Sequence, residues 1–312
     1  MEGCGSSEFS ILPNGILLAA RVMMSQEVIA LQMRSLPHEM RTFVGAGAFC
    51  LFVLTIPSGA LGAGPTDKTP THKTISVGTR TVKLTLARPT AGAAPPFLVV
   101  FASGDGGLRG VSKDLLVHLA GETYWVVGFS SPEAFKGIAD DSKGQPNYEG
   151  ARDRLASLVG QAKQAMELPA QTPIVITGMS RGANVVVAAA GDAALRPGIV
   201  GAVAIALTRE FDDLTVPDTV AGRPGVQTDD KGRLQTYPSL QRLGSMPLAI
   251  IQSTNDSYVR SSESRRLLGP DTPTRRLYEI ESKNHSFGGG QVPLMRALDD
   301  AMTWVGLSLT AP

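Results

Sequence analysis

The chain has 312 residues, of which 43% are hydrophobic and 18% are charged, and this composition excludes a disordered or fibrous protein. Its 29 basic and 28 acidic residues leave a formal net charge of +1, which argues against nucleic acid as a partner. The two cysteines, Cys4 and Cys50, lie near the amino terminus and form no metal or redox motif. If the amino-terminal stretch that contains both cysteines is removed, the mature chain has no thiol, and its chemistry must use hydroxyl and carboxylate groups.

Residues 40–63 have the pattern of an export signal. A basic residue precedes the apolar run 43–56, a proline ends it, and small residues then offer cleavage points after Ala60 or Ala63. An uncleaved membrane anchor over the same residues and a buried amino-terminal helix are the alternatives. The sequence therefore predicts an exported protein, held at the membrane if the signal is retained.

The segments on either side of this signal have different characters. Residues 1–39 are either an amino-terminal extension or the product of a misassigned start, in which case Met40 is the true first residue. Residues 64–72 are polar and rich in Pro and Thr, which is typical of a linker. Residues 73–312 are then expected to form one folded domain.

This domain begins with residues 74–88, where apolar and polar side chains alternate around Gly78, and that pattern predicts a half-buried antiparallel hairpin. The strands that follow are expected to be buried on both faces, because they are short apolar runs without alternation. These runs span residues 97–102, 125–129, 174–177, 200–207 and 248–253.

Segments with helical spacing lie between and after these runs. An apolar stripe from Leu155 to Met166 and another from Leu294 to Val305 each occupy one face of a helix. A last strand is predicted over residues 276–280. The alternation of strand and helix favours a mostly parallel sheet with helices on both faces, the α/β architecture.

The stretch with the most chemical information is Gly178-Met179-Ser180-Arg181-Gly182, which follows a predicted strand and precedes a predicted helix. A Gly-x-Ser-x-Gly sequence in this setting forms the nucleophile elbow of α/β-hydrolases, a sharp turn that raises the serine hydroxyl above the sheet. The backbone N–H of Arg181 would then point at a developing oxyanion. We therefore predict the α/β-hydrolase fold, with Ser180 as nucleophile.

A serine nucleophile needs a base, and in this fold the chain order is nucleophile, acid, histidine. Of the four histidines, His285 alone follows Ser180, and it lies between the last predicted strand and the closing helix. Asp256 directly follows the strand 248–253, so it is the favoured acid that would orient the imidazole. The competing acids are Asp212, Asp213, Asp229 and Asp230.

The other half of an oxyanion hole is expected in the glycine-rich loop after the first buried strand, residues 103–107. The donor there is the amide of Asp105 or Gly106. Residues 208–245 form a small polar insert after the sixth strand, and we expect them to act as a lid that selects the substrate. This chemistry requires no metal or cofactor.

Four motifs resemble those of the AcvB/VirJ group of bacterial periplasmic virulence proteins, which look like small α/β-hydrolases. They are the loop FASGDGG at 101–107, the elbow GMSRGAN at 178–184, the acid turn STND at 253–256 and the ending NHSFGGG at 284–290. The resemblance implies a periplasmic location and, for some members, hydrolysis of aminoacylated phosphatidylglycerol, an ester of lysine on a membrane lipid.

This chain departs from the family pattern at two positions. Leu108 stands where the family usually has Trp, and Asn184 stands where it has Asp. The substrate can therefore differ from that of the family. The expected partner is a small-molecule or lipid ester, with contact to a membrane surface in the lipid case. The alternative is a non-catalytic binding protein that keeps the hydrolase scaffold and serves a membrane or secretion partner.

Overall fold

The computed structural model describes residues 70–77, 80–89, 97–121, 124–135, 148–216 and 220–308. The predicted extension, export signal and nearly all of the predicted linker lie outside these residues. Among the described residues, no helix combines the length and the apolar character needed to cross a bilayer. Strand β1 already begins at Thr71, two residues before the position where the sequence predicts folding to begin.

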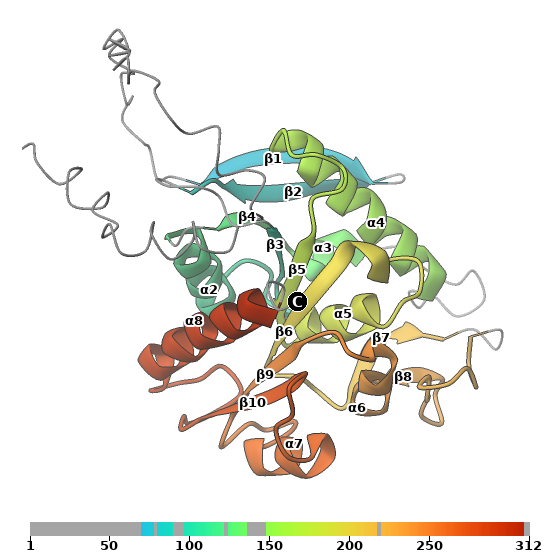
Figure 1. Ribbon diagram of the computed structural model, residues 1–312, viewed down its shortest axis with the longest axis vertical. Helices are drawn as coiled ribbons and strands as arrows, with labels where there is room; N and C mark the ends of the chain where they lie inside the picture. Colours follow the sequence, from blue (N-terminus) through green and yellow to red (C-terminus); the bar gives the residue numbers. More distant parts are fainter. Residues whose placement is uncertain are drawn as a thin grey trace, which may run out of the picture. The chain divides into compact units, whose positions relative to one another are not determined.

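The centre of the fold is an eight-stranded sheet with the strand order β1-β2-β4-β3-β5-β6-β9-β10 (Figure 1). From β4 to β10 all neighbouring strands are parallel, whereas β1 pairs with β2 and β2 with β4 in antiparallel fashion. The strands are β1 Thr71–Val77, β2 Arg80–Ala87, β3 Leu98–Ala102, β4 Trp125–Phe129, β5 Ile174–Met179, β6 Ile199–Ile205, β9 Leu248–Ser253 and β10 Arg275–Ile280. This is the predicted mostly parallel sheet with an antiparallel hairpin at one edge.

Successive residues of the parallel strands enter two different cores, because side chains alternate between the faces of a sheet. On β3, Val100 and Ala102 belong to the core on one face, while Val99 and Phe101 belong to the core on the other. All five residues of β3 are buried. Burial on both faces explains why these strands read as continuous apolar runs in the sequence.

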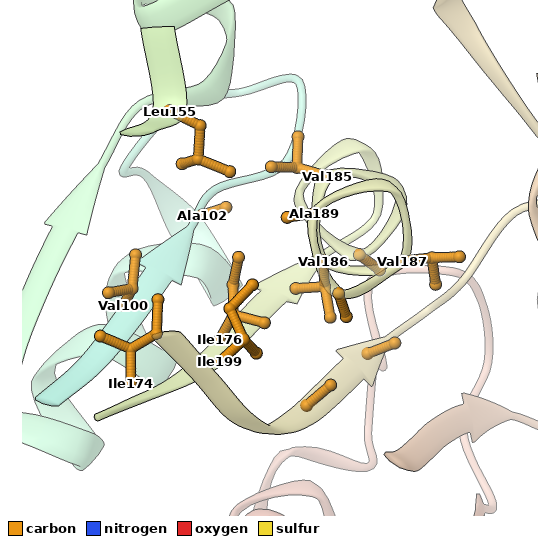
Figure 2. Close-up of a cluster of buried hydrophobic side chains, with 14 of the residues drawn as sticks. Val100, Ala102, Leu155, Ile174, Ile176, Val185, Val186, Val187, Ala189 and Ile199 are labelled. Atoms are coloured by element: carbon orange, nitrogen blue, oxygen red, sulfur yellow. The ribbon is translucent and has the colours of Figure 1, made fainter. Parts of the chain in front are cut away.

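Helices cover both faces (Figure 1). The apolar sides of α3, α4 and α5 pack into one core, and those of α2 and α8 pack into the other. Figure 2 shows Val186 of α5 beside Ile176 of the sheet, and Val185 of the same helix turned towards Leu155. The helices are α2 Gly110–Gly121, α3 Ser131–Phe135, α4 Tyr148–Ala165, α5 Arg181–Ala190, α7 Ser261–Leu268 and α8 Gln291–Ser308.

The insert after β6 contributes apolar side chains to the core, although its sequence is mostly polar. It contains a small antiparallel pair, β7 Glu210–Thr215 and β8 Arg233–Gln235, followed by the short helix α6 Thr236–Ser239 and a 3-10 turn, Leu240–Leu243. Phe211, Leu214 and Leu234 are buried and join the core beneath α5. The predicted lid is therefore partly a structural element of the domain.

Candidate active site

The residues predicted to carry chemistry lie at one edge of the sheet, because each follows the carboxyl end of a parallel strand. Ser180 follows β5, Asp256 follows β9 and His285 follows β10. The loop 103–107 follows β3, the neighbour of β5. From β3 the chain passes to β4 on one side and then to β5 on the other, and ligand sites of open α/β sheets lie at such a reversal of strand order.

Ser180 has the strained backbone of a sharp strand-to-helix turn. Its φ of 55° and ψ of −119° lie in a region that side-chain-bearing residues rarely adopt. Hydrogen bonds hold the turn: the Ser180 N–H donates to the carbonyl of Ile205 at 2.8 Å, and the Ser180 carbonyl accepts from the N–H of Ala183, also at 2.8 Å. The turn projects the serine side chain out of the sheet edge.

The two glycines of the elbow allow close backbone packing. A Cβ added to Gly182 would lie 2.0 Å from the carbonyl oxygen of Ala102, and one added to Gly178 would lie 2.4 Å from the carbonyl oxygen of Gly182. Both distances are far below van der Waals contact. The start of α5 can therefore approach the end of β3 only because these positions carry no side chain.

Gly182→Ala is expected to lower the free energy of unfolding by about 3 kcal/mol or more, because backbone atoms must move apart to admit the methyl group. Urea unfolding measures this change. Gly160→Ala is the matched control, since Gly160 lies in α4 with open space around its position, and it should raise stability by up to about 1 kcal/mol. A wild-type unfolding midpoint for Gly182→Ala would show that this packing is not needed.

Ser180, His285 and Asp256 form a continuous chain of contacts. The Oγ of Ser180 lies 2.8 Å from Nε2 of His285, and Nδ1 of the same ring lies 2.7 Å from Oδ2 of Asp256. The Asp256 side chain has no exposed surface, whereas 16% of the His285 side chain is exposed. The carboxylate is thus shielded from water, and the imidazole lies between it and the serine at the surface.

The buried Asp256 carboxylate is held on both oxygens. Its Oδ1 accepts the backbone N–H groups of Tyr258 at 2.8 Å and Val259 at 3.3 Å. Its Oδ2 accepts Nε2 of Gln252 at 3.0 Å in addition to its contact with His285. These donors compensate the carboxylate for the loss of water and fix its orientation towards the imidazole.

Gln252 is a residue that the sequence analysis did not identify. It is fully buried in β9, and its amide also accepts the N–H of Leu207 at 3.0 Å and donates to the carbonyl of Val259. A glutamine within the apolar run 248–253 was the available signal, because a buried polar side chain in a strand needs specific partners. It joins the ends of β6 and β9 beneath the acid.

Gln252→Met is expected to lower the free energy of unfolding by about 1–3 kcal/mol, since the carbonyl of Val259 and the N–H of Leu207 would lose their partner while remaining buried. Urea unfolding measures the loss. Gln241→Met is the control, because Gln241 is exposed in the 3-10 turn, and it should change stability by less than about 0.5 kcal/mol. Equal midpoints for the two variants would contradict this account of Gln252.

The loop after β3 presents backbone amides beside Ser180. The N–H of Gly104 donates to Oγ of Ser112, and that of Gly107 donates to the carbonyl of Gly104. The N–H groups of Asp105 and Gly106, the two predicted alternatives, find no acceptor among the described residues. A Cβ on Gly104 would lie 3.3 Å from Cβ of Ser180, which shows how closely this loop approaches the serine.

The side chains of Asp105 and Arg181 join the two halves of the predicted oxyanion hole. Nε of Arg181 donates to Oδ1 of Asp105 in an ion pair. Arg181 is the first residue of α5, where the backbone N–H groups of a helix point outward from its end. The ion pair therefore ties the loop after β3 to the residue that follows Ser180.

A small pocket lies beside Ser180, with a volume of about 40 Å³. The ring of Tyr258 lines it and contacts the His285 ring edge-on, with centroids 4.7 Å apart. Asn184, one of the two departures from the family pattern, also lines it. Its Nδ2 donates to Oγ1 of Thr208 at 2.7 Å and to the carbonyl of Glu210 at 3.1 Å, which a carboxylate cannot do.

Two of the competing acids, Asp212 and Asp229, pair with an arginine instead of His285, although Asp212 also lines the pocket beside Ser180. The carboxylate of Asp212 pairs with the guanidinium of Arg233, which also binds Asp229. Burial raises the pKa of Asp229, but hydrogen bonds from Arg233 and Lys231 outweigh it and hold this pKa below its usual value. Asp256 is therefore the acid that the structure brings against His285. Among the described residues, no group of three or more His, Cys, Asp or Glu side chains is arranged to hold a metal ion.

No protein-family model matches the sequence, and neither does any curated protein sequence. Solved structures do match. An alpha-beta serine hydrolase homologue from Coxiella burnetii has a TM-score of 0.51 at 16% identity, covering 74% of this chain and 96% of that one. Est1E from Butyrivibrio proteoclasticus has a TM-score of 0.51 at 14% identity, covering 75% and 98%. A soluble variant of monoglyceride lipase from Saccharomyces cerevisiae, bound to a substrate analogue, has a TM-score of 0.51 at 14% identity, covering 76% and 95%.

Proposed function

We propose that this chain is an exported serine hydrolase that cleaves an ester. Its α/β-hydrolase fold, which the strand order and the structural neighbours show, supports the proposal. The observation that carries the proposal is the contact chain from Ser180 through His285 to Asp256, with distances of 2.8 Å and 2.7 Å. A base within hydrogen-bond reach of a hydroxyl, and itself oriented by a third group, is the arrangement that nucleophilic catalysis requires.

In the proposed reaction, the Ser180 hydroxyl donates its proton to Nε2 of His285 as its oxygen bonds to the ester carbonyl carbon. The carbonyl π electrons move to its oxygen, which the backbone N–H groups of Arg181 and of Asp105 or Gly106 stabilise. His285 then gives the proton to the departing alcohol oxygen as the carbon–oxygen bond breaks. Water repeats the sequence on the acyl-enzyme, which releases the acid and restores Ser180.

The resemblance to the AcvB/VirJ group suggests the class of ester. We propose an aminoacylated phospholipid such as lysyl-phosphatidylglycerol, acted on in the periplasm. The motifs at 101–107, 178–184, 253–256 and 284–290 support this choice, since they supply every residue used in the proposed reaction. Leu108 and Asn184 are the positions where substrate preference is expected to diverge from the group.

The test is to incubate the purified protein with a fluorophosphonate probe and identify the modified peptide by mass spectrometry. We expect one adduct, on Ser180, and none after heat denaturation. In parallel, vesicles containing lysyl-phosphatidylglycerol should release lysine, and vesicles of plain phosphatidylglycerol should release little fatty acid. A protein that neither reacts with the probe nor hydrolyses any ester would overturn the proposal and favour a binding protein on a hydrolase scaffold.

Export is proposed from residues 40–63 and has its own test. The protein is expected in the periplasmic fraction, with a new amino terminus near Leu61 or Gly64. Recovery of an intact chain from the membrane fraction would instead indicate a retained anchor. Recovery from the cytoplasm would argue against export.

A further inference from the structure

A second, larger cavity lies on the other side of the loop that carries Asp105. We call it the basic groove; it has a volume of about 660 Å³, and its walls come from the β1–β2 hairpin, the loop after β3, helix α2 and the start of α3. Asp105 lines both this groove and the pocket beside Ser180. A molecule whose ester lies at Ser180 can therefore extend past the loop into the groove.

Three cations line the groove: Lys83 from β2, Arg109 from the turn before α2, and Lys113 from α2. All three are exposed, and none forms an ion pair with a described residue. Of the two carboxylates in the lining, Asp105 is neutralised by Arg181, which leaves Glu133. The groove thus holds an excess of positive charge on a chain whose net charge is only +1.

The arrangement of these cations follows from the backbone. Lys83 and Thr85 lie two residues apart on β2, so both project from the same face, and Thr85 is the partner of His72 across the hairpin. All three residues line the groove. Arg109 and Lys113 are four residues apart at the start of α2, whose first turn contains no acidic residue. The hairpin and the helix thus contribute their cations to the lining of one cavity.

The remaining walls are apolar in part. Leu108, Leu116 and Val117 line the groove beside the cations, and half of the Val117 side chain is exposed. A concave surface that combines apolar walls with a few convergent charges is typical of a small-molecule site. The matching ligand carries a negative charge next to an apolar portion.

We propose that the basic groove binds a phosphate group on the substrate, so that the enzyme prefers esters whose alcohol portion carries a phosphodiester. This inference rests on the proposed function of Ser180 and assigns the specificity of the same site to Lys83, Arg109 and Lys113. The phosphate is held by cations on two walls, and the loop with Asp105 separates it from the reacting carbonyl. Electrostatic attraction in a groove with an excess of positive charge also raises the local concentration of an anionic substrate.

The experiment compares two esters that differ only in the phosphate: 1-butyrylglycerol, and the same molecule with a methyl phosphodiester at carbon 3. The groove variant is Lys83→Gln with Arg109→Gln and Lys113→Gln. The control variant, Lys73→Gln with Lys231→Gln and Arg296→Gln, removes the same charge from exposed positions outside the groove; Lys73 lies on the opposite face of β1 from His72.

In the groove variant, kcat/KM for the phosphodiester ester is expected to fall roughly tenfold or more, mainly through KM, while that for 1-butyrylglycerol changes less than about twofold. The control variant should match the wild type on both esters. Added salt should lower the wild-type preference for the phosphodiester and leave the groove variant unaffected. Equal losses on both esters, or no loss on either, would overturn the proposal.

A binding measurement separates this inference from the proposed function. Calorimetry with 1-butylglycerol methyl phosphodiester, the ether that cannot be hydrolysed, should show binding to the wild type and to Ser180→Ala but not to the groove variant. Binding of the phosphodiester with no hydrolysis of any ester would support the groove proposal and contradict the proposed hydrolase activity. Hydrolysis of 1-butyrylglycerol without binding of the phosphodiester would support the hydrolase activity and overturn the groove proposal. Vesicles of phosphatidylglycerol, compared with the soluble ester, distinguish a lipid headgroup from a free phosphodiester as the source.

Discussion

Ser180→Ala is expected to abolish reaction with the fluorophosphonate probe and to lower kcat for ester hydrolysis by a factor of roughly 10⁴ to 10⁶. The variant keeps its amide groups at the oxyanion hole and its substrate contacts, so a small residual acceleration over water remains. It loses the oxygen that forms the acyl-enzyme, and His285 loses the hydroxyl from which it takes a proton. Nothing else described beside the imidazole offers a nucleophile at 2.8 Å.

The control for this variant is Ser286→Ala. Ser286 follows His285 directly and is exposed, but its hydroxyl is not part of the contact chain. This variant should keep the wild-type rate within about twofold. Circular dichroism on both proteins shows whether the fold is retained. If Ser180→Ala still reacted with the probe while Ser286→Ala did not, the nucleophile would have to be reassigned.

Much of the fold could be predicted because burial on both faces leaves a clear pattern in the sequence. The strands β4 and β9 have the predicted bounds, Trp125–Phe129 and Leu248–Ser253. Strand β5 is longer than predicted, since it includes Gly178 and Met179 of the elbow. Glycine in an apolar run marks a turn by propensity, yet here Gly178 remains in the strand because α5 packs closely against it.

The insert after β6 shows where sequence composition misleads. Its many charged and polar residues predict a solvent-exposed lid, but scattered apolar residues such as Phe211 and Leu234 enter the core. Strand β8 has only 3 residues, and the pairing of the 6-residue β7 with it shifts register between Glu210 and Thr215, so neither strand leaves a regular alternation in the sequence. Pairing of Asp212 with Arg233 across these strands depends on the tertiary fold and has no local sequence signal.

The sequence predicts the three side chains of the contact chain, but not the residues that hold them in place. The elbow motif predicts Ser180, and chain order then predicts His285 and favours Asp256, because the fold places each after a particular strand. Gln252 and Tyr258 support Asp256 and His285 through contacts that depend on how β6, β9 and β10 lie side by side. The hydrogen bond from Leu207 to Gln252 and the ring contact of Tyr258 with His285 join residues far apart in the chain, so they follow from the three-dimensional arrangement.

Asp256→Asn is expected to lower kcat by roughly 10⁴-fold while leaving the fold intact, because it reverses the hydrogen bond to the imidazole. The asparagine Oδ1 must remain where it accepts the N–H groups of Tyr258 and Val259. Its Nδ2 then takes the place of Oδ2 and donates to Nδ1 of His285. The ring must now carry its proton on Nε2, so it can no longer accept the proton of the serine hydroxyl.

The orientation of that asparagine is fixed by the supports around it. In the orientation described, the Nδ2 group faces one donor, Nε2 of Gln252, whereas in the flipped orientation it would face two backbone N–H donors. Two donors facing each other without an acceptor cost about 1–3 kcal/mol in a buried site. The hydrogen-bond network that orients the Asp256 carboxylate therefore also holds the side-chain amide of the Asp256→Asn variant in the orientation that donates to His285.

Asp212→Asn is the matched control, because Asp212 is one of the four competing acids, lines the pocket beside Ser180 and pairs with Arg233. It should retain kcat within about threefold, since its carboxylate does not contact the imidazole. Initial rates on 1-butyrylglycerol and the rate constant for the fluorophosphonate reaction provide two independent readouts. A larger loss in Asp212→Asn than in Asp256→Asn would mean that the acid changes partners when substrate binds. The Asp256 contact of 2.7 Å would then describe only the free protein.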